Sequence, residues 1–281
     1  MGEQFVYDFS QGDASMKSLL GGKGANLAQM VRLGLPVPPG FIITTEACKA
    51  YWKETSGLLD RIWPDVKAAV GRLETSTGKS FGGADPLLVS VRSGAPVSMP
   101  GMMETILNLG LNDETVLRLG EAAKNERFAY DRYRRFIQMF GNVVMGIDSG
   151  EFEFPLSQLK RRLGFSYDYQ IPAEEWKTLI GTFKEIVRRS TGKDFPMDPW
   201  EQLRSAIEAV FASWNIPRAM AYRKINKISD ELGTAVNVVA MVFGNLGEDC
   251  GTGVCFTRNP SHGEKRLYGE FLLNAQGEDV V

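Results

Sequence analysis

A long block of helical periodicity, from about residue 112 to 197, divides this 281-residue chain and most constrains its fold. Within the block, Tyr130, Tyr133, Ile137 and Phe140 recur at helical spacing, with basic residues between them. The segments on either side carry short apolar, β-branched runs bounded by glycine and proline, which are typical of strands. The sequence therefore predicts an α+β fold with a mixed sheet and an all-helical insertion.

The order of the predicted elements suggests how the chain is organised. A glycine-rich loop is expected at residues 21–24, with a helix from Ala25, and another helix is expected from Thr45. Strands are expected at residues 41–44, 87–91, 235–243, 251–257 and 266–273. The predicted units are a first lobe (1–111 and 198–241), the helical insertion (112–197) and the start of an incomplete second lobe (242–281).

Composition excludes several classes of function. Thirty-two basic and 34 acidic side chains give a net charge of −2, so no global field favours nucleic acid or an anionic membrane. No stretch approaches the roughly 20 apolar residues that span a bilayer, and no signal-peptide pattern opens the chain, so we expect a cytoplasmic protein. Cys48, Cys250 and Cys255 form no CxxC pair, and the sequence offers no recognisable metal-ligand set.

Lys23 is the first candidate ligand-binding residue, because it stands within the GGKG segment at 21–24. Glycines let backbone N–H groups approach a ligand closely while an ammonium group reaches a phosphate oxygen. The segment is not a Walker A loop, which needs Ser or Thr after its lysine, where this chain has Gly24. From the residues alone, a glycine turn with a solvated lysine is the slightly better interpretation.

The stretch from Ser90 to Thr105 is a stronger candidate. Arg92 stands at the end of a predicted strand, and the loop after it ends on the Thr105 hydroxyl. A guanidinium group and a hydroxyl in a glycine-containing loop suit phosphate oxygens and their metal ion. The alternative is a Pro- and Gly-rich connection whose methionines pack on the core.

Two further features have structural alternatives. The apolar run 236–243 could form a strand and hinge against which a purine lies, although periodicity alone favours an inner strand. Both interpretations can hold at once. His262, the single histidine, stands in a turn at residues 259–263, where an exposed loop histidine is expected.

Several motifs together resemble the N-terminal, ATP-grasp-like nucleotide-binding domain of the pyruvate, phosphate dikinase family. The similarity runs almost from end to end, with the motifs in the same order. They are GGKGANLA (21–28), GLPVPPGF (34–41), VRSGA (91–95), PGMMET (100–105), YRRFIQMFG (133–141), VFGN (242–245) and GEFLLNAQGEDVV (269–281).

The resemblance implies that ATP lies between two lobes and passes its β-phosphoryl group to a histidine of a separate swivelling domain. Another domain then passes that phosphoryl group to pyruvate, which forms phosphoenolpyruvate. Lys23 and Arg92 would hold the phosphates, with Mg²⁺ bridging them. Other implied contacts are the covering loop (Gly101, Met102, Met103 and Thr105) and the adenine segment (Val239, Ala240, Met241 and Val242).

The chain departs from the family pattern in two residues and in extent. Glu104 is usually aspartate in the family, and Val239 is usually glutamine, which would offer a polar contact near the nucleotide. The family's acidic metal-binding strand and a Gln-x-Arg strand follow the point that matches Val281, and the phosphohistidine and pyruvate domains are also missing. We therefore expect a truncated fragment of a homodimeric enzyme, inactive alone.

Two other functions compete with a nucleotide-binding fragment. One is a folded module that binds no nucleotide and interacts through its helical insertion. The other is an ATP-grasp phosphotransferase with a different acceptor, such as phosphoenolpyruvate synthase or an antibiotic-phosphorylating relative. Residues 133–141 and 269–281 resemble the dikinase more than either of these enzymes.

Overall fold

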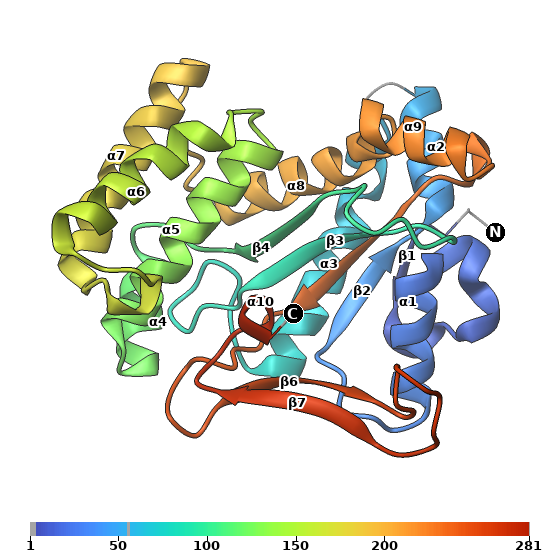
Figure 1. The fold of residues 1–281 in the computed structure, drawn as a ribbon. Helices are drawn as coiled ribbons and strands as arrows, with labels where there is room; N and C mark the ends of the chain where they lie inside the picture. Colours follow the sequence, from blue (N-terminus) through green and yellow to red (C-terminus); the bar gives the residue numbers. More distant parts are fainter. Residues whose placement is uncertain (1–3, 55–56, 281) are drawn as a thin grey trace.

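The computed structural model describes residues 4–54 and 57–280. Its strands form a five-stranded sheet in the order β1-β2-β5-β3-β4 and a separate two-stranded ribbon of β6 and β7 (Figure 1). The strands are β1 Val6–Asp8, β2 Gly40–Ile43, β3 Val89–Gly94, β4 Thr105–Leu109, β5 Ala235–Ala240, β6 Gly251–Phe256 and β7 Tyr268–Leu273. The helices are α1 Lys17–Arg32, α2 Thr45–Glu54, α3 Gly57–Thr77, α4 Thr115–Ala123, α5 Glu126–Val143, α6 Ser149–Leu163, α7 Ala173–Thr191, α8 Pro199–Ser213, α9 Pro217–Ile225 and α10 Gly277–Val280.

The α+β prediction is confirmed, but the prediction of a mixed sheet is wrong. Every pairing between the named strands is antiparallel. Strands β2 and β3 run in the same direction, but β5 lies between them and is antiparallel to both. A strand that follows the helical block thus separates the two strands that could have formed a parallel pair.

The two faces of the large sheet are covered by different helices. Because side chains alternate along a strand, Phe41 and Ile43 face the main core while Ile42 between them faces the other side. The main core also contains buried side chains of α2, α3 and α8. On the opposite face, Ile42 packs with Leu20 and Ala25 of α1. Helix α1 contacts β2, β3 and β5, and pockets open beside it at β3 and β4.

The segment between β4 and α8 is helical, and α4 to α7 gather beyond the β4 end of the sheet (Figure 1). Tyr133, Ile137 and Phe140, three members of the aromatic stripe of α5, are buried, and Tyr130 packs at its margin. The Asn125 side chain caps α5 by accepting a hydrogen bond from the Phe128 N–H at 3.0 Å. The stripe is core, as its spacing indicates.

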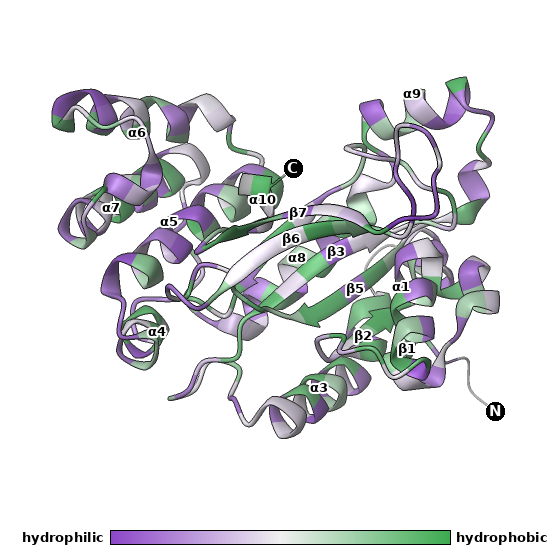
Figure 2. Ribbon diagram, turned by 60° about the horizontal axis from the view of Figure 1, so that its bottom comes forward, coloured by the Kyte–Doolittle hydropathy of each residue, from purple (hydrophilic) through white to green (hydrophobic). Residues whose placement is uncertain are grey.

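The β6–β7 ribbon carries apolar side chains that contact little of the described chain. Exposed large residues on it are Phe256, Tyr268, Phe271, Leu272 and Leu273. In Figure 2 each strand of the ribbon is green over one part of its length and pale over the other. None of the helices in the described ranges is both long and apolar enough to cross a membrane.

The GGKG segment is not the continuous loop that the sequence predicts. Helix α1 begins at Lys17 and runs through it, broken at Gly21, whose φ of 70° and ψ of 166° are not helical. The strong helix-forming residues on both sides resume the helix after a single residue, so the glycines produce a kink. Strand β1, helix α3 and strand β4 were not predicted; Thr105 was taken as the end of a loop.

Candidate functional site

Three polar side chains stand in one row across the open part of the sheet. Arg92 on β3 pairs with Asn237 on β5 and with Thr105 on β4. Directly paired residues in a sheet point to the same face, so this row faces the side that α1 occupies. The β3–β4 pairing is irregular between Val89 and Val91. Such irregularities commonly re-aim side chains next to functional sites.

The kink at Gly21 brings Lys23 to the end of this row. The Gly21 backbone lies so close to β3 that an added Cβ would stand 1.7 Å from the Gly94 carbonyl oxygen. The next residue, Gly22, donates its N–H to the Ala95 carbonyl at 2.9 Å. A Cβ on Gly94 would in turn meet Lys23 Cβ at 3.4 Å. The glycines therefore fix a lysine against the end of β3.

Two adjoining pockets open around these residues. The first, here called the loop pocket, has a volume of about 520 Å³ and lies between the start of α1 and residues 93–105. The second, the strand-end pocket, is about 320 Å³ and lies between β3, β4, α5 and residues 241–245. Lys23 lines the first pocket, Arg92 lines the second, and Thr105 lines both.

Neither Lys23 nor Arg92 forms an ion pair with a described residue. Arg92 donates through Nε to the Ser90 hydroxyl at 3.2 Å, which leaves the rest of its guanidinium group available. Burial among protein atoms, and then the positive charge of Arg92, lower the pKa of Lys23; burial likewise lowers the pKa of Arg92. The Lys23 side chain nevertheless remains open to the solvent of the pocket. Two neighbouring cations without a counter-ion suit a polyanionic ligand.

The loop at residues 98–104 is held from outside by Arg218 of α9. Its guanidinium group forms an ion pair with Glu104 and donates to the Met102 carbonyl at 3.3 Å. The Glu104 N–H also points to the Ser213 hydroxyl, at 3.4 Å. This loop, which forms one wall of the loop pocket, is therefore positioned by α8 and α9.

We expect Arg218→Ala to loosen this loop without unfolding the chain. The pair is partly exposed and contributes on the order of 1 kcal/mol or less. Hydrogen exchange should speed up at the amides of residues 101–104 and stay unchanged in α7. Arg188→Ala, which removes an exposed i,i+3 pair on α7, is the control. Equal exchange in the two variants would contradict a positioning role for Arg218.

The structure brings most of the sequence-predicted residues to the two pockets. Gly101, Met103 and Thr105 line the loop pocket, whereas Met102 packs against the main core. In the adenine segment, Met241 and Val242 line the strand-end pocket. Val239 and Ala240 lie within β5 and line neither pocket, because β5 ends only at Ala240. What each residue binds stays a prediction.

Sequence reasoning missed two buried amides at this site. Asn237 is fully buried, donates to the Arg92 carbonyl at 3.4 Å, and has no partner for its Oδ1 among the described residues. Asn108 lines the strand-end pocket with φ of 64°, and its buried Oδ1 also has no such partner. An asparagine within the apolar run 235–240 was a readable signal for Asn237. Nothing local in the sequence marked Asn108.

Comparison with known protein families matches most of this chain to one family. The family described as "Pyruvate phosphate dikinase, AMP/ATP-binding domain" matches residues 17–63 and 58–281. The chain belongs to this family. The match includes the glycine kink, the β3 end and both pockets.

Curated relatives from distant organisms agree with this membership. Pyruvate, phosphate dikinase of Clostridium symbiosum is 52% identical over 280 residues, which is 99% of this chain and 32% of the relative. The enzyme of that name from Rhizobium meliloti (strain 1021) is 54% identical over 283 residues, again 99% of this chain and 32% of the relative. Pyruvate, phosphate dikinase 1, chloroplastic, of Arabidopsis thaliana is 54% identical over 97% of this chain and 28% of its own length. The chain thus spans just under a third of these relatives.

Proposed function

We propose that this chain is the ATP-binding portion of a pyruvate, phosphate dikinase, with an ATP-grasp-like architecture in which the nucleotide lies between the large sheet and the β6–β7 ribbon. Lys23 and Arg92 bind the phosphates, and the loop at Gly101 to Thr105 covers them. The adenine lies beside Met241 and Val242, at the end of β5. Val239 and Ala240, which lie within β5, would then position the adenine segment without lining either pocket.

The observation that carries this proposal is the pair of unmatched cations at the two adjoining pockets, Lys23 in the loop pocket and Arg92 in the strand-end pocket. An unpaired charge surrounded by protein is unfavourable unless it has a partner. Lys23 and Arg92 have no carboxylate partner among the described residues. The close contact of Gly21 with Gly94 holds Lys23 at the end of β3, near enough for the charge of Arg92 to lower its pKa. A string of phosphate oxygens supplies the missing charge. The same donors stabilise charge that develops on a transferred phosphoryl group.

The fit to Mg²⁺ is poorer than the fit to ATP. In the described ranges, no three His, Cys, Asp or Glu side chains are grouped so that they could hold a metal ion. We therefore assign no step to the metal within this chain. In the parent enzyme, Mg²⁺ would accompany the ATP phosphates and take its protein ligands from elsewhere.

The complete reaction would need further parts of the parent enzyme. His262, the single histidine, stands in an exposed turn between β6 and β7. An exposed turn is not the setting expected of a carrier histidine, which must approach the nucleotide phosphates. We propose that the carrier histidine and the pyruvate site belong to other domains, and that this portion alone does not catalyse the complete reaction. A cytoplasmic homodimer remains part of this proposal for the parent enzyme.

Thermal unfolding with and without Mg²⁺-ATP tests this function. A ligand at about 100 times its Kd raises the free energy of unfolding by roughly 2.7 kcal/mol. We expect a clear upward shift in Tm for the wild type. Lys23→Gln and Arg92→Gln should each weaken ATP binding by about 10- to 100-fold, since each removes a charge-assisted hydrogen bond of about 1.5–3 kcal/mol.

The matched control is Lys193→Gln, which removes one positive charge at an exposed site of the loop after α7. It should leave the ATP-dependent shift unchanged. If the wild type shows no shift, the chain acts as a module without nucleotide binding. If Lys23→Gln and Arg92→Gln match the control, ATP binds elsewhere.

A further inference from the structure

Asn237 is the one polar residue within β5, and its side chain is completely buried. It lies directly opposite Arg92 of β3, on the face of the sheet that α1 covers. Its Nδ2 donates to the Arg92 carbonyl at 3.4 Å, and its Oδ1 has no hydrogen-bond partner among the residues that the structure describes. A buried acceptor without a partner is unfavourable, and an apolar side chain would avoid that cost. Packing alone therefore does not account for an amide at this position.

Two glycines make the slot that the amide occupies. A Cβ on Gly24 of α1 would stand 2.9 Å from Asn237 Oδ1, and a Cβ on Gly94 of β3 would stand 2.6 Å from Asn237 Nδ2. Neither approach is sterically acceptable, so only glycine leaves room for the amide on both sides. Gly24 directly follows Lys23 in the chain. The amide therefore spans the gap between α1 and β3 and sets how closely the segment that carries Lys23 approaches the sheet.

The amide adjoins both cations of the candidate site without adding charge. The Cβ that Gly94 lacks would stand 3.4 Å from Lys23 Cβ, so the stem of Lys23 borders the same slot. Burial, and then the positive charge of Arg92, lower the pKa of Lys23, as expected for two cations near each other. Since Asn237 is neutral, both positive charges are left for a ligand to balance.

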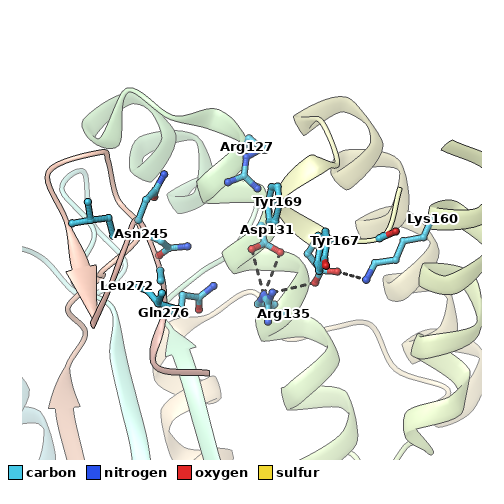
Figure 3. A pocket seen from close by; sticks show the side chains of 14 residues that line it. Arg127, Asp131, Arg135, Lys160, Tyr167, Tyr169, Asn245, Leu272 and Gln276 are labelled. Atoms are coloured by element: carbon cyan, nitrogen blue, oxygen red, sulfur yellow. Dashed lines mark hydrogen bonds and ion pairs between the residues drawn. The ribbon is translucent and has the colours of Figure 1, made fainter. Parts of the chain in front are cut away.

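The buried cations of α5 have a different arrangement, with a carboxylate among them. Asp131 accepts hydrogen bonds from Arg132 at 2.7 Å and from Arg134 at 2.6 Å, and Figure 3 shows Arg135 joined to the same carboxylate. Burial opposes ionisation of this carboxyl group, but the guanidinium groups hold its pKa below the ordinary value. An aspartate at position 237 would have nearly the shape of asparagine and would likewise be ionised beside cations. The neutral amide is therefore what distinguishes this site from an internal ion-pair network.

We propose that Asn237 is a positioning and specificity-determining residue: it sets the distance of Lys23 from β3, and its lack of charge leaves Lys23 and Arg92 to a polyanionic ligand. The inference rests on the proposed function for the identity of that ligand, but not for the contacts of the amide. Two cations that no internal carboxylate balances favour the more highly charged of two nucleotides. Without a metal ion, ATP should therefore bind more tightly than AMP, and Asn237 should control that difference.

Calorimetric titration of the whole chain with ATP and with AMP, both in the absence of divalent metal, tests the effect of charge. We expect Asn237→Asp to weaken ATP binding by about 10-fold or more, because its carboxylate offsets one of the two positive charges. AMP binding should weaken less, since the lost attraction grows with the charge of the ligand. The ratio of the two affinities should therefore fall. A substitution that only disturbs the fold would leave this ratio unchanged.

Asn237→Ala tests the effect of position, with Val238→Ala as its matched control. Val238 is the next residue of β5 and is equally buried, but it packs in the main core on the other face of the sheet. Both variants should unfold at lower urea concentration than the wild type, because each leaves a cavity. Only Asn237→Ala should also weaken ATP binding to the folded chain, by about 3- to 10-fold, since α1 loses the group that sets its distance from β3.

Titration of Lys23 itself needs no nucleotide, so it separates this inference from the proposed function. The ¹³C NMR signals of reductively methylated lysines follow the ammonium groups, and Lys23→Gln assigns the signal of Lys23. Asn237→Asp should raise the pKa of Lys23, because a nearby carboxylate favours the charged form, and Val238→Ala should leave it unchanged. This result in a chain that binds no ATP would contradict the proposed function but support the placement of Asn237.

Three outcomes would overturn the inference. One is an unchanged pKa of Lys23 in Asn237→Asp, which would mean that the residue at position 237 does not act on the cation. Another is an ATP-to-AMP affinity ratio that Asn237→Asp leaves at the wild-type value. The third is equal ATP affinity of Asn237→Ala and Val238→Ala, which decides the question even if Asn237→Asp does not fold.

Discussion

Replacing Gly21 by alanine is expected to lower the free energy of unfolding by about 3 kcal/mol or more. The alanine Cβ would stand 1.7 Å from the Gly94 carbonyl oxygen and 2.7 Å from its carbonyl carbon, so the start of α1 and the end of β3 must separate. The φ of 70° adds about 1–2 kcal/mol of strain for a residue with a Cβ. Because the same contact positions Lys23, Mg²⁺-ATP should stabilise the variant less than the wild type.

Urea unfolding of Gly21→Ala and Gly34→Ala separates these two effects. Gly34 has a similar φ of 74°, but no atom lies within 4 Å of its added Cβ. We therefore expect Gly34→Ala to cost only the backbone strain, about 1–2 kcal/mol, with ATP binding intact. Equal destabilisation in the two variants would show that the approach of Gly21 to Gly94 is not a constraint.

The strongly periodic parts of the fold were predictable from the sequence. The α5 stripe and the buried face of α8 follow directly from apolar residues at helical spacing, and β5 follows from an apolar run bounded by turns. The strand order was not predictable, because β5 pairs with β2 and β3 across long sequence separations. Strands β1 and β4, of three and five residues, are too short to give a clear alternation and were missed.

The candidate site was predictable where glycine and charge occur together. Nearby glycines marked Lys23 and Arg92 as candidates, but the family resemblance, and not the residues alone, favoured a phosphate-binding role for Lys23. The fold places their segments in contact. The row from Asn237 through Arg92 to Thr105 depends on strand register, which no local pattern encodes. For the same reason, only the structure separates Met241 and Val242, at the strand-end pocket, from Val239 and Ala240 within β5.

Asp131→Asn is expected to destabilise the chain by about 3–5 kcal/mol at neutral pH. The carboxylate is buried and is the shared acceptor for Arg132, Arg134 and Arg135. An amide of the same shape keeps the packing but removes the negative charge and places a donor against guanidinium groups. Breaking a buried pair in this way leaves uncompensated cations, which costs about this much. Urea unfolding measures the change, and Asp60→Asn, at an exposed partner of Arg204, should cost less than about 1 kcal/mol.

The pH dependence of this difference identifies the charge as its cause. The guanidinium groups lower the folded-state pKa of Asp131 below its ordinary value of 3.8, despite the opposing effect of burial. A group with a depressed folded pKa contributes stability that is fully present above its unfolded pKa and is lost as pH falls toward the folded pKa. The gap in free energy of unfolding between the wild type and Asp131→Asn should therefore be constant near neutral pH and shrink below about pH 4. A gap that stays constant down to pH 3 would mean that altered packing, rather than the lost carboxylate charge, destabilises the variant.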